Sequence, residues 1–308
     1  MSCSIKEKLA QYYLNFRKND HLYLFNKGMP KKAEKELLNF LLNQQLNIED
    51  EYHSYKLEGN KIMSFVFARK NNDEGEDTLV SEMIIQDNCV TKSMIKEEIA
   101  KIKSFYKDKY EYKKIIFVAR STQNKLTQLY NELEFEFTGY TYIGKVIDAL
   151  KYYNNKDLSC PDGIKIRIAT LQDLTKILQL GEICHGADQT SRIHNNVSVL
   201  QKEFSDVYKK SIKDKATFLI IDKSKIIGYL VTLLNYKNYD KKVLIGDIGV
   251  HPDHWGNGFA NILYNKAFQF MKSKEIEMYL GTSSTKSVMN LSKKLNRKVL
   301  LSVYYINI

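Results

Sequence analysis

The chain has 308 residues, which is enough for two domains, because a single hydrophobic core rarely serves much beyond ~250 residues. Its 47 basic and 36 acidic residues give a net charge of +11, but the lysines are spread thinly and no basic-aromatic motif appears, which argues against a nucleic-acid surface. The longest apolar run is too short to span a bilayer and the first residues lack a signal-peptide core, so we expect a cytoplasmic protein with no membrane partner. The four cysteines show no C-x-x-C spacing, which predicts neither a zinc site nor a disulfide framework.

The first half of the chain alternates helical and strand patterns. Gly59 and Asn60 mark a turn between two of the strands. In chain order, apolar spacing predicts a helix over 4–18, a strand over 21–25, a helix from Pro30, strands over 51–57, 61–69 and 78–85, a helix over 95–106, a strand over 114–119, a helix over 126–133 and a strand or pair of strands over 135–147.

A stretch reading YYNNKDLSCPDG, from Tyr152 to Gly163, breaks both periodicities and predicts a domain boundary. A capping-box pattern then starts a helix at Thr170, with Asp173 three residues on. The second half is predicted to contain a strand over 164–169, that helix, a polar stretch over 185–197, a helix over 200–208, strands over 216–221, 226–234 and 243–250, a helix through 263–271, a strand over 277–282, a helix over 288–295 and a strand over 299–306.

Residues 243–260 read VLIGDIGVHPDHWGNGFA and combine a strand, a glycine loop and a helix. A glycine loop at a helix start presents free backbone N–H groups and the positive end of the helix dipole, and the missing side chains let a phosphate approach. We therefore expect a phosphate-bearing ligand at Gly256 and Gly258, with an ordinary strand-to-helix turn as the competing interpretation. The G-x-G-x-x-G spacing of dinucleotide sites is absent.

The run Val250-His251-Pro252, followed by Trp255-Gly256-Asn257-Gly258-Phe259-Ala260, resembles motif A of the GNAT acetyltransferases, Arg/Gln-x-x-Gly-x-Gly/Ala after a V-x-P strand end. The resemblance implies acetyl-CoA as co-substrate. It implies that the backbone of Ile248, Gly249 and Val250 meets the pantetheine arm. It also implies that the pyrophosphate cradle is formed by Trp255, Gly256, Asn257, Gly258, Phe259 and Ala260. Trp255 departs from the family pattern, because the family has Arg or Gln there.

The two halves look like a diverged tandem repeat. The run KIMSFV at 61–66 parallels KIIGYL at 225–230, and LYNELEF at 129–135 is similar to the L-Y-x-x-L-G-F ending of a GNAT helix. No glycine occurs between Asp87 and Ser93, where the first half should have its loop. We therefore expect an α/β (α+β) chain of two GNAT-like domains, each with a mixed, mostly antiparallel central sheet flanked by helices. Residues 1–152 would be degenerate and 163–308 would bind acetyl-CoA.

Asp247 is the hypothesised base for the acceptor. We expect it to share a strand face with Val243 and Ile245, and we expect burial to raise its pKa toward a useful range. The competing interpretation is a strand-end residue that bonds a local backbone N–H. The family often protonates the thiolate with a tyrosine on the late helix, but Ser292 stands there, and Tyr304 on the last strand is the substitute candidate, with packing as its alternative role.

We expect an N-acetyltransferase that moves an acetyl group from acetyl-CoA to a primary amine of a small molecule or peptide. A non-catalytic CoA-sensing or interaction module stays open because of Trp255 and Ser292, and a basic nucleic-acid-associated protein is the third alternative. Cys184 and His185 are adjacent on a helix, so we expect them to point in different directions rather than act as a nucleophile and base. Homodimer formation is left open.

Overall fold

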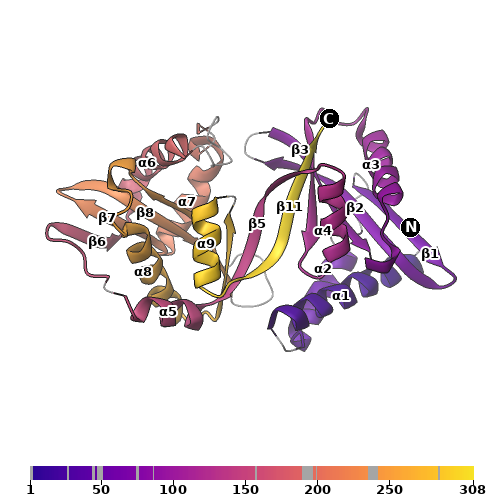
Figure 1. Ribbon diagram of the computed structural model, residues 1–308, viewed down its shortest axis with the longest axis horizontal. Helices are drawn as coiled ribbons and strands as arrows, with labels where there is room; N and C mark the ends of the chain where they lie inside the picture. Colours follow the sequence, from indigo (N-terminus) through magenta and orange to yellow (C-terminus); the bar gives the residue numbers. More distant parts are fainter. Residues whose placement is uncertain are drawn as a thin grey trace. The chain divides into compact units, whose positions relative to one another are not determined.

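The computed structural model describes residues 3–25, 28–43, 46, 51–73, 76–85, 87–156, 158–188, 197–198, 200–234, 242–283 and 285–308 (Figure 1). The chain forms two compact units, Met1–Tyr140 with Val299–Ile308, and Thr141–Lys298. Each unit has a mixed, mostly antiparallel sheet flanked by helices, which confirms the expected fold class. None of the helices in the described part of the chain has the length and apolarity that crossing a bilayer requires.

The first unit has strand order β1-β2-β3-β4-β11-β5, where β11 is Lys298–Asn307, and β3 and β4 are parallel. Val66 and Ala68 of β2 pack into the core under α3 and α4. Phe67 lies on the opposite face, where its ring centroid is 6.3 Å from that of Tyr13 in α1. The elements that precede β11 are α1 (Cys3–Phe25), α2 (Lys31–Asn43), β1 (Tyr52–Glu58), β2 (Lys61–Asp73), β3 (Glu76–Ile85), a 3-10 turn (Asp87–Cys89), α3 (Lys92–Tyr106), β4 (Lys114–Arg120), α4 (Asn124–Glu132) and β5 (Glu136–Lys145).

The strand expected over 21–25 is wrong, because α1 continues through Phe25. Within this stretch His21 and Leu24 are buried, whereas Leu22 and Tyr23 are exposed. That pattern follows the helical period rather than the two-residue alternation of a strand. A five-residue apolar run is too short for its periodicity to separate the two structures.

The second unit has strand order β5-β10-β9-β8-β7-β6, and β9 and β10 are parallel. Helices α5 and α8 cover one face of the sheet, and α6 and α7 cover the other. Its elements are α5 (Val146–Asn154), β6 (Ile164–Ile168), a 3-10 turn (Leu171–Asp173), α6 (Leu174–Ala187), a π-helical turn (Leu200–Phe204), α7 (Ser205–Lys213), β7 (Thr217–Asp222), β8 (Lys225–Leu233), β9 (Lys242–Val250), a 3-10 turn (Pro252–His254), α8 (Phe259–Ser273), β10 (Met278–Ser283) and α9 (Lys286–Lys294).

The compact units do not coincide with the expected division into 1–152 and 163–308. The last strand, β11 (Lys298–Asn307), pairs antiparallel with β4 and so completes the sheet of the first unit, as the yellow strand in Figure 1 shows. Helix α5, which the sequence pattern did not predict, belongs to the second unit, and its buried residues join that core. Part of the polar stretch expected over 185–197 lies outside the described residues.

Candidate active site

The glycine loop lies between β9 and α8. Gly256 and Gly258 have φ values of +83° and +77°, and a Cβ at either position would meet no heavy atom within 4 Å. Gly258 caps α8 without a side-chain hydrogen bond. Within the described chain, no N–H of residues 256–258 donates to another backbone group. The loop therefore combines unbonded donors, open space and a helix N-terminus, which fits a phosphate.

Trp255 links this loop to the end of β9 through a hydrogen bond. Its indole N–H donates to the carbonyl oxygen of Val250 at 2.7 Å, and its ring is half exposed. The bond links the end of β9 to the residue just before Gly256. Trp255 thus has a structural contact at the position where the family pattern has Arg or Gln.

The pairing between the parallel strands β9 and β10 stops before either strand ends. The register runs from Met278↔Lys242 to Gly281↔Ile245, while β9 continues to Val250. Ile248, Gly249 and Val250 pair with β8 on their other side. The two parallel strands therefore part at the level of the residues expected to meet the pantetheine arm.

A β-bulge at Gly246 sets the direction of Asp247. The register with β8 shifts between Val231↔Asp247 and Thr232↔Ile245, so Gly246 is the extra residue. Ile245 packs in the core under α5 and α8, whereas Asp247 bonds to residues of α6, α7 and β8. The expectation that the two share a strand face is wrong, because one extra residue reverses the alternation.

The Asp247 carboxylate accepts hydrogen bonds from four donors. The hydroxyls of Tyr208 and Tyr229 donate to Oδ2, the latter at 2.6 Å. The N–H of Ile248 donates to Oδ1 at 2.8 Å, and Nε2 of His185 lies 3.2 Å from Oδ1 and 3.3 Å from Oδ2. The backbone contact matches the competing interpretation of Asp247, but the three side-chain contacts go beyond it.

The titratable groups around Asp247 have shifted pKa values. Burial raises the pKa of Asp247, but the hydrogen bond and charge of His185, helped by the two tyrosine hydroxyls, outweigh it, so the pKa lies below its usual range, contrary to expectation. Burial and the charge of Asp247 raise the pKa of Tyr208 and Tyr229 well above the usual range. The same two causes raise the pKa of Cys184 to about 12. The tyrosines and the thiol therefore keep their protons at neutral pH.

Two glycines make room for this cluster. A Cβ at Gly249 would lie 3.0 Å from Sγ of Cys184 and would also clash with the ring of Tyr229. A Cβ at Gly181 in α6 would lie 3.0 Å from the Tyr229 hydroxyl oxygen. Cys184 and His185 are adjacent on α6 and were expected to point in different directions, but both side chains lie beside Asp247. In the sequence, Gly181, Cys184 and His185 share one helix face at i, i+3 and i+4, and this spacing is the signal that indicates a cluster there.

The other two candidate catalytic residues, Ser292 and Tyr304, make contacts of their own within their units. The Ser292 hydroxyl is buried in α9, donates to the carbonyl oxygen of Val288 at 2.8 Å and accepts from Arg297 at 3.3 Å. Tyr304 lies in the core of the first unit, where its ring centroid is 5.3 Å from that of Tyr130 and 5.4 Å from that of Phe137. Both side chains therefore have packing partners.

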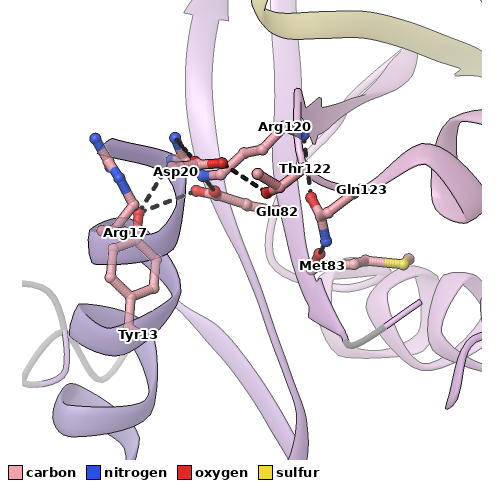
Figure 2. A network of polar contacts seen from close by, with 8 residues as sticks. All are labelled: Tyr13, Arg17, Asp20, Glu82, Met83, Arg120, Thr122 and Gln123. Atoms are coloured by element: carbon pink, nitrogen blue, oxygen red, sulfur yellow. Dashed lines mark hydrogen bonds and ion pairs between the residues drawn. The ribbon is translucent and has the colours of Figure 1, made fainter. Parts of the chain in front are cut away.

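The first unit carries a carboxylate at the corresponding register. Glu82 of β3 lies opposite Phe67, three residues before the strand ends, as Asp247 lies opposite Val231, three residues before the end of β9. Figure 2 shows that Glu82 bonds the guanidinium of Arg120, which also contacts Asp20 at 3.4 Å. This carboxylate is thus neutralised by a cation from its own unit.

The helix that follows β3 has its own cap. Thr91 precedes α3, and its hydroxyl accepts the N–H of Met94 at 3.2 Å. The corresponding helix in the second unit, α8, has Gly258 at the cap position and no side-chain acceptor. Of the two helix starts, the one at α8 therefore has donors available for an anion.

Comparison with known proteins identifies the fold. Residues 188–292 match the model of the Acetyltransferase (GNAT) family. No curated protein sequence matches the chain significantly. A GCN5-related N-acetyltransferase from Sphaerobacter thermophilus matches over 100% of this chain and 94% of its own, with TM-score 0.66 and 11% identity. A tandem GNAT protein from the clavulanic acid biosynthesis pathway, solved without AcCoA, matches over 97% of this chain and 94% of its own, with TM-score 0.52 and 8% identity. Residues 188–292 are therefore similar to the GNAT family, and the chain as a whole has the fold of these GNAT structures.

Proposed function

We propose that the protein is an acetyl-CoA-dependent N-acetyltransferase that moves an acetyl group to a primary amine of a small molecule or peptide. The observation that carries the proposal is the glycine loop, where two left-handed glycines with open space precede the uncapped start of α8. Such a loop suits the pyrophosphate of coenzyme A. The parting of β9 and β10 supports placement of the pantetheine arm beside Ile248, Gly249 and Val250.

Acetyl-CoA would supply an activated thioester, so that a C–N bond forms, the C–S bond breaks, coenzyme A leaves as the thiol and one proton goes to water. The residues of the loop would hold the pyrophosphate through the N–H groups of Gly256, Asn257 and Gly258. The bond from Trp255 to Val250 would keep the loop in its shape. The cluster around Asp247 would accept the proton that the acceptor amine releases.

Gly258→Glu tests the binding site. A side chain and a negative charge would enter the cradle, so we expect acetyl-CoA binding to be lost in calorimetry, while the parent chain binds one molecule. Gly59→Glu is the matched control, because Gly59 also has a positive φ of +58° and open space, but lies in the turn between β1 and β2. Unchanged affinity in Gly258→Glu, or two equivalent sites per chain, would contradict the site assignment.

The alternative is a non-catalytic CoA-sensing or interaction module. The buried, internally bonded hydroxyl of Ser292 favours it, because that position offers no acid of the kind the family often uses. Turnover of acetyl-CoA with a panel of primary amines separates the two functions. Binding without turnover would favour the module.

A further inference from the structure

The parallel strands of the first unit also part before they end. The pairing of β3 and β4 stops at Glu82↔Val118. Beyond this pair, β3 continues to Ile85 and β4 continues to Arg120. The pairing of β9 and β10 in the second unit stops in the same way. Each unit therefore has a strand parting, which is the point where the ladder between its parallel strands stops before the strands do.

The side-chain amide of Gln123 bridges the strand parting of the first unit. Its Nε2 donates to the carbonyl oxygen of Met83 at 2.6 Å, and its Oε1 accepts the backbone N–H of Arg120 at 3.0 Å (Figure 2). Met83 is the first residue of β3 beyond the paired register, and Arg120 is the last residue of β4. Gln123 is 1% exposed. A single buried amide thus bonds both strands at the point where they cease to bond each other.

Gln123 does not act as a cap for its own helix. It stands at the N-cap position of α4, but its side chain makes no hydrogen bond to that helix. Helix α9 follows β10 as α4 follows β4, and its N-cap residue Thr285 accepts the N–H of Val288 at 3.3 Å, as an N-cap side chain ordinarily does. The partners of the Gln123 side chain are therefore the two strands rather than the helix that it precedes.

We propose that the strand parting of the first unit is a binding site for an amide, and that Gln123 occupies it where the second unit would take the pantetheine arm. A carboxamide has a carbonyl acceptor and N–H donors, which match the N–H of Arg120 and the carbonyl oxygen of Met83. The pantetheine arm of coenzyme A also carries amide groups, so Gln123 closes the first unit to such an arm. The comparison with the coenzyme rests on the proposed function, whereas the amide site rests on the two hydrogen bonds of Gln123.

Gln123→Ala tests the site with acetamide, which has the heavy atoms that the substitution removes. The N–H of Arg120 and the carbonyl oxygen of Met83 would be buried without this partner, so we expect the melting temperature of the full chain to fall by about 5 °C or more. Acetamide should raise the melting temperature of Gln123→Ala as its concentration increases, because a ligand that binds the folded state stabilises it. The parent chain, whose site is occupied, should show no such rise.

Three controls separate an amide site from a general effect of the additive. N,N-dimethylacetamide keeps the carbonyl group but has no N–H for Met83, so it should not restore Gln123→Ala. Gln123→Met fills the space without an amide, so it should be destabilised and should not respond to acetamide. Gln128→Ala removes the same group from an exposed site of α4, where Gln128 bonds Glu132 at 2.6 Å, and should show little loss and no response.

A measurement on the parent chain covers the case in which Gln123→Ala does not fold. In the assigned NMR spectrum of the full chain, we expect the side-chain N–H protons of Gln123 to exchange slowly with solvent, because they are buried and one of them is bonded to Met83. The side-chain N–H protons of Gln128, at its exposed site, should exchange fast. Equally fast exchange at both residues would contradict the bridge.

The outcomes for the amide site and for the proposed function are separate. If acetamide raises the melting temperature of neither Gln123→Ala nor Gln123→Met, or of both equally, the amide site is contradicted and the proposed function stands. If acetamide restores Gln123→Ala but the parent chain binds no acetyl-CoA in calorimetry, the amide site stands. The proposed function is then contradicted, and the comparison of Gln123 with the pantetheine arm is contradicted with it.

Discussion

Two buried arginines show how differently the same side chain can be accommodated. In the first unit Arg120 contacts Asp20 and Glu82 and donates to the hydroxyl of Tyr13 at 3.2 Å (Figure 2). In the second unit Arg297 donates to Tyr279 at 3.0 Å and lies over aromatic rings, but no carboxylate within the described chain pairs with it. Its Nη2 atom is buried and has no hydrogen-bond partner among the residues that the structure describes. The first cation therefore neutralises buried acids, whereas the second is held by hydrogen bonds and aromatic faces.

Arg120→Met should destabilise the protein strongly. The change leaves Asp20 and Glu82 buried without their cation, and breaking a buried pair in this way costs about 3–5 kcal/mol. Arg297→Met is the control, because it removes a buried guanidinium without leaving a carboxylate unpaired, and we expect a much smaller loss or a gain. Urea unfolding followed by circular dichroism measures both. Equal losses in the two variants would contradict this account of Arg120.

At the scale of single elements, the 3-10 turn Leu171–Asp173, which leads into α6, depends on Asp173. Asp173 accepts two hydrogen bonds from Arg167, each at 2.7 Å, and one from the N–H of Thr170 at 2.8 Å. With Thr170 it forms the capping box that the sequence predicted. The hydrogen bonds from Arg167, opposed by burial and supported by Thr170, hold the pKa of Asp173 well below its usual range. The 3-10 turn that leads into α6 is thus fixed by an ionised carboxylate.

Asp173→Ala should lower the free energy of unfolding by about 1–2 kcal/mol at pH 7, since it removes a helix cap. Because the folded-state pKa is depressed, this stabilisation is present above the unfolded pKa of ~3.9 and is lost as the pH falls below it toward the folded pKa. The difference between the parent chain and the variant should therefore shrink in acid. Asp162→Ala, at an exposed acid near the boundary, is the control. A gap that is constant from pH 7 down to pH ~2.5 would refute the assignment of the stabilisation to the ionised carboxylate.

At the scale of the whole molecule, the two units do not divide the chain in sequence order. Val299–Ile308 completes the sheet of the first unit, and Thr141–Lys298 forms the second. Helix α5 begins before the expected boundary at 152–163 and ends within it, yet it contributes Val146, Ala149, Leu150 and Tyr153 to the core of the second unit. A cut at residue 163 would remove these four side chains from that core.

A fragment of residues 163–308 should therefore fold poorly, whereas residues 141–298 should unfold cooperatively. Burial of one large apolar side chain contributes about 1.5–3 kcal/mol, so loss of several such residues is comparable to the total stability of a domain. The fragment 163–308 also carries β11 without β4, its partner. Calorimetric melting of both fragments checks this. Cooperative melting of 163–308 at the temperature of 141–298 would show that α5 is dispensable.

The sequence by itself determined the features that local patterns encode. The glycine loop, the capping box and most helices and strands depend on residues close together in the chain, and the repeat of their order predicted the fold class. Short segments were less certain, since five residues at 21–25 fit a strand as well as a helix.

Only the tertiary structure decided what surrounds Asp247. His185, Tyr208 and Tyr229 are 62, 39 and 18 residues away from it in the chain, on three different elements, and no spacing rule connects them. The bulge at Gly246 turns Asp247 toward them, and a single extra residue in a strand leaves no clear trace in the apolar pattern. The pairing of β11 with β4 is likewise fixed by contacts between distant strands, because strand patterns specify which face is buried but not which strand lies alongside.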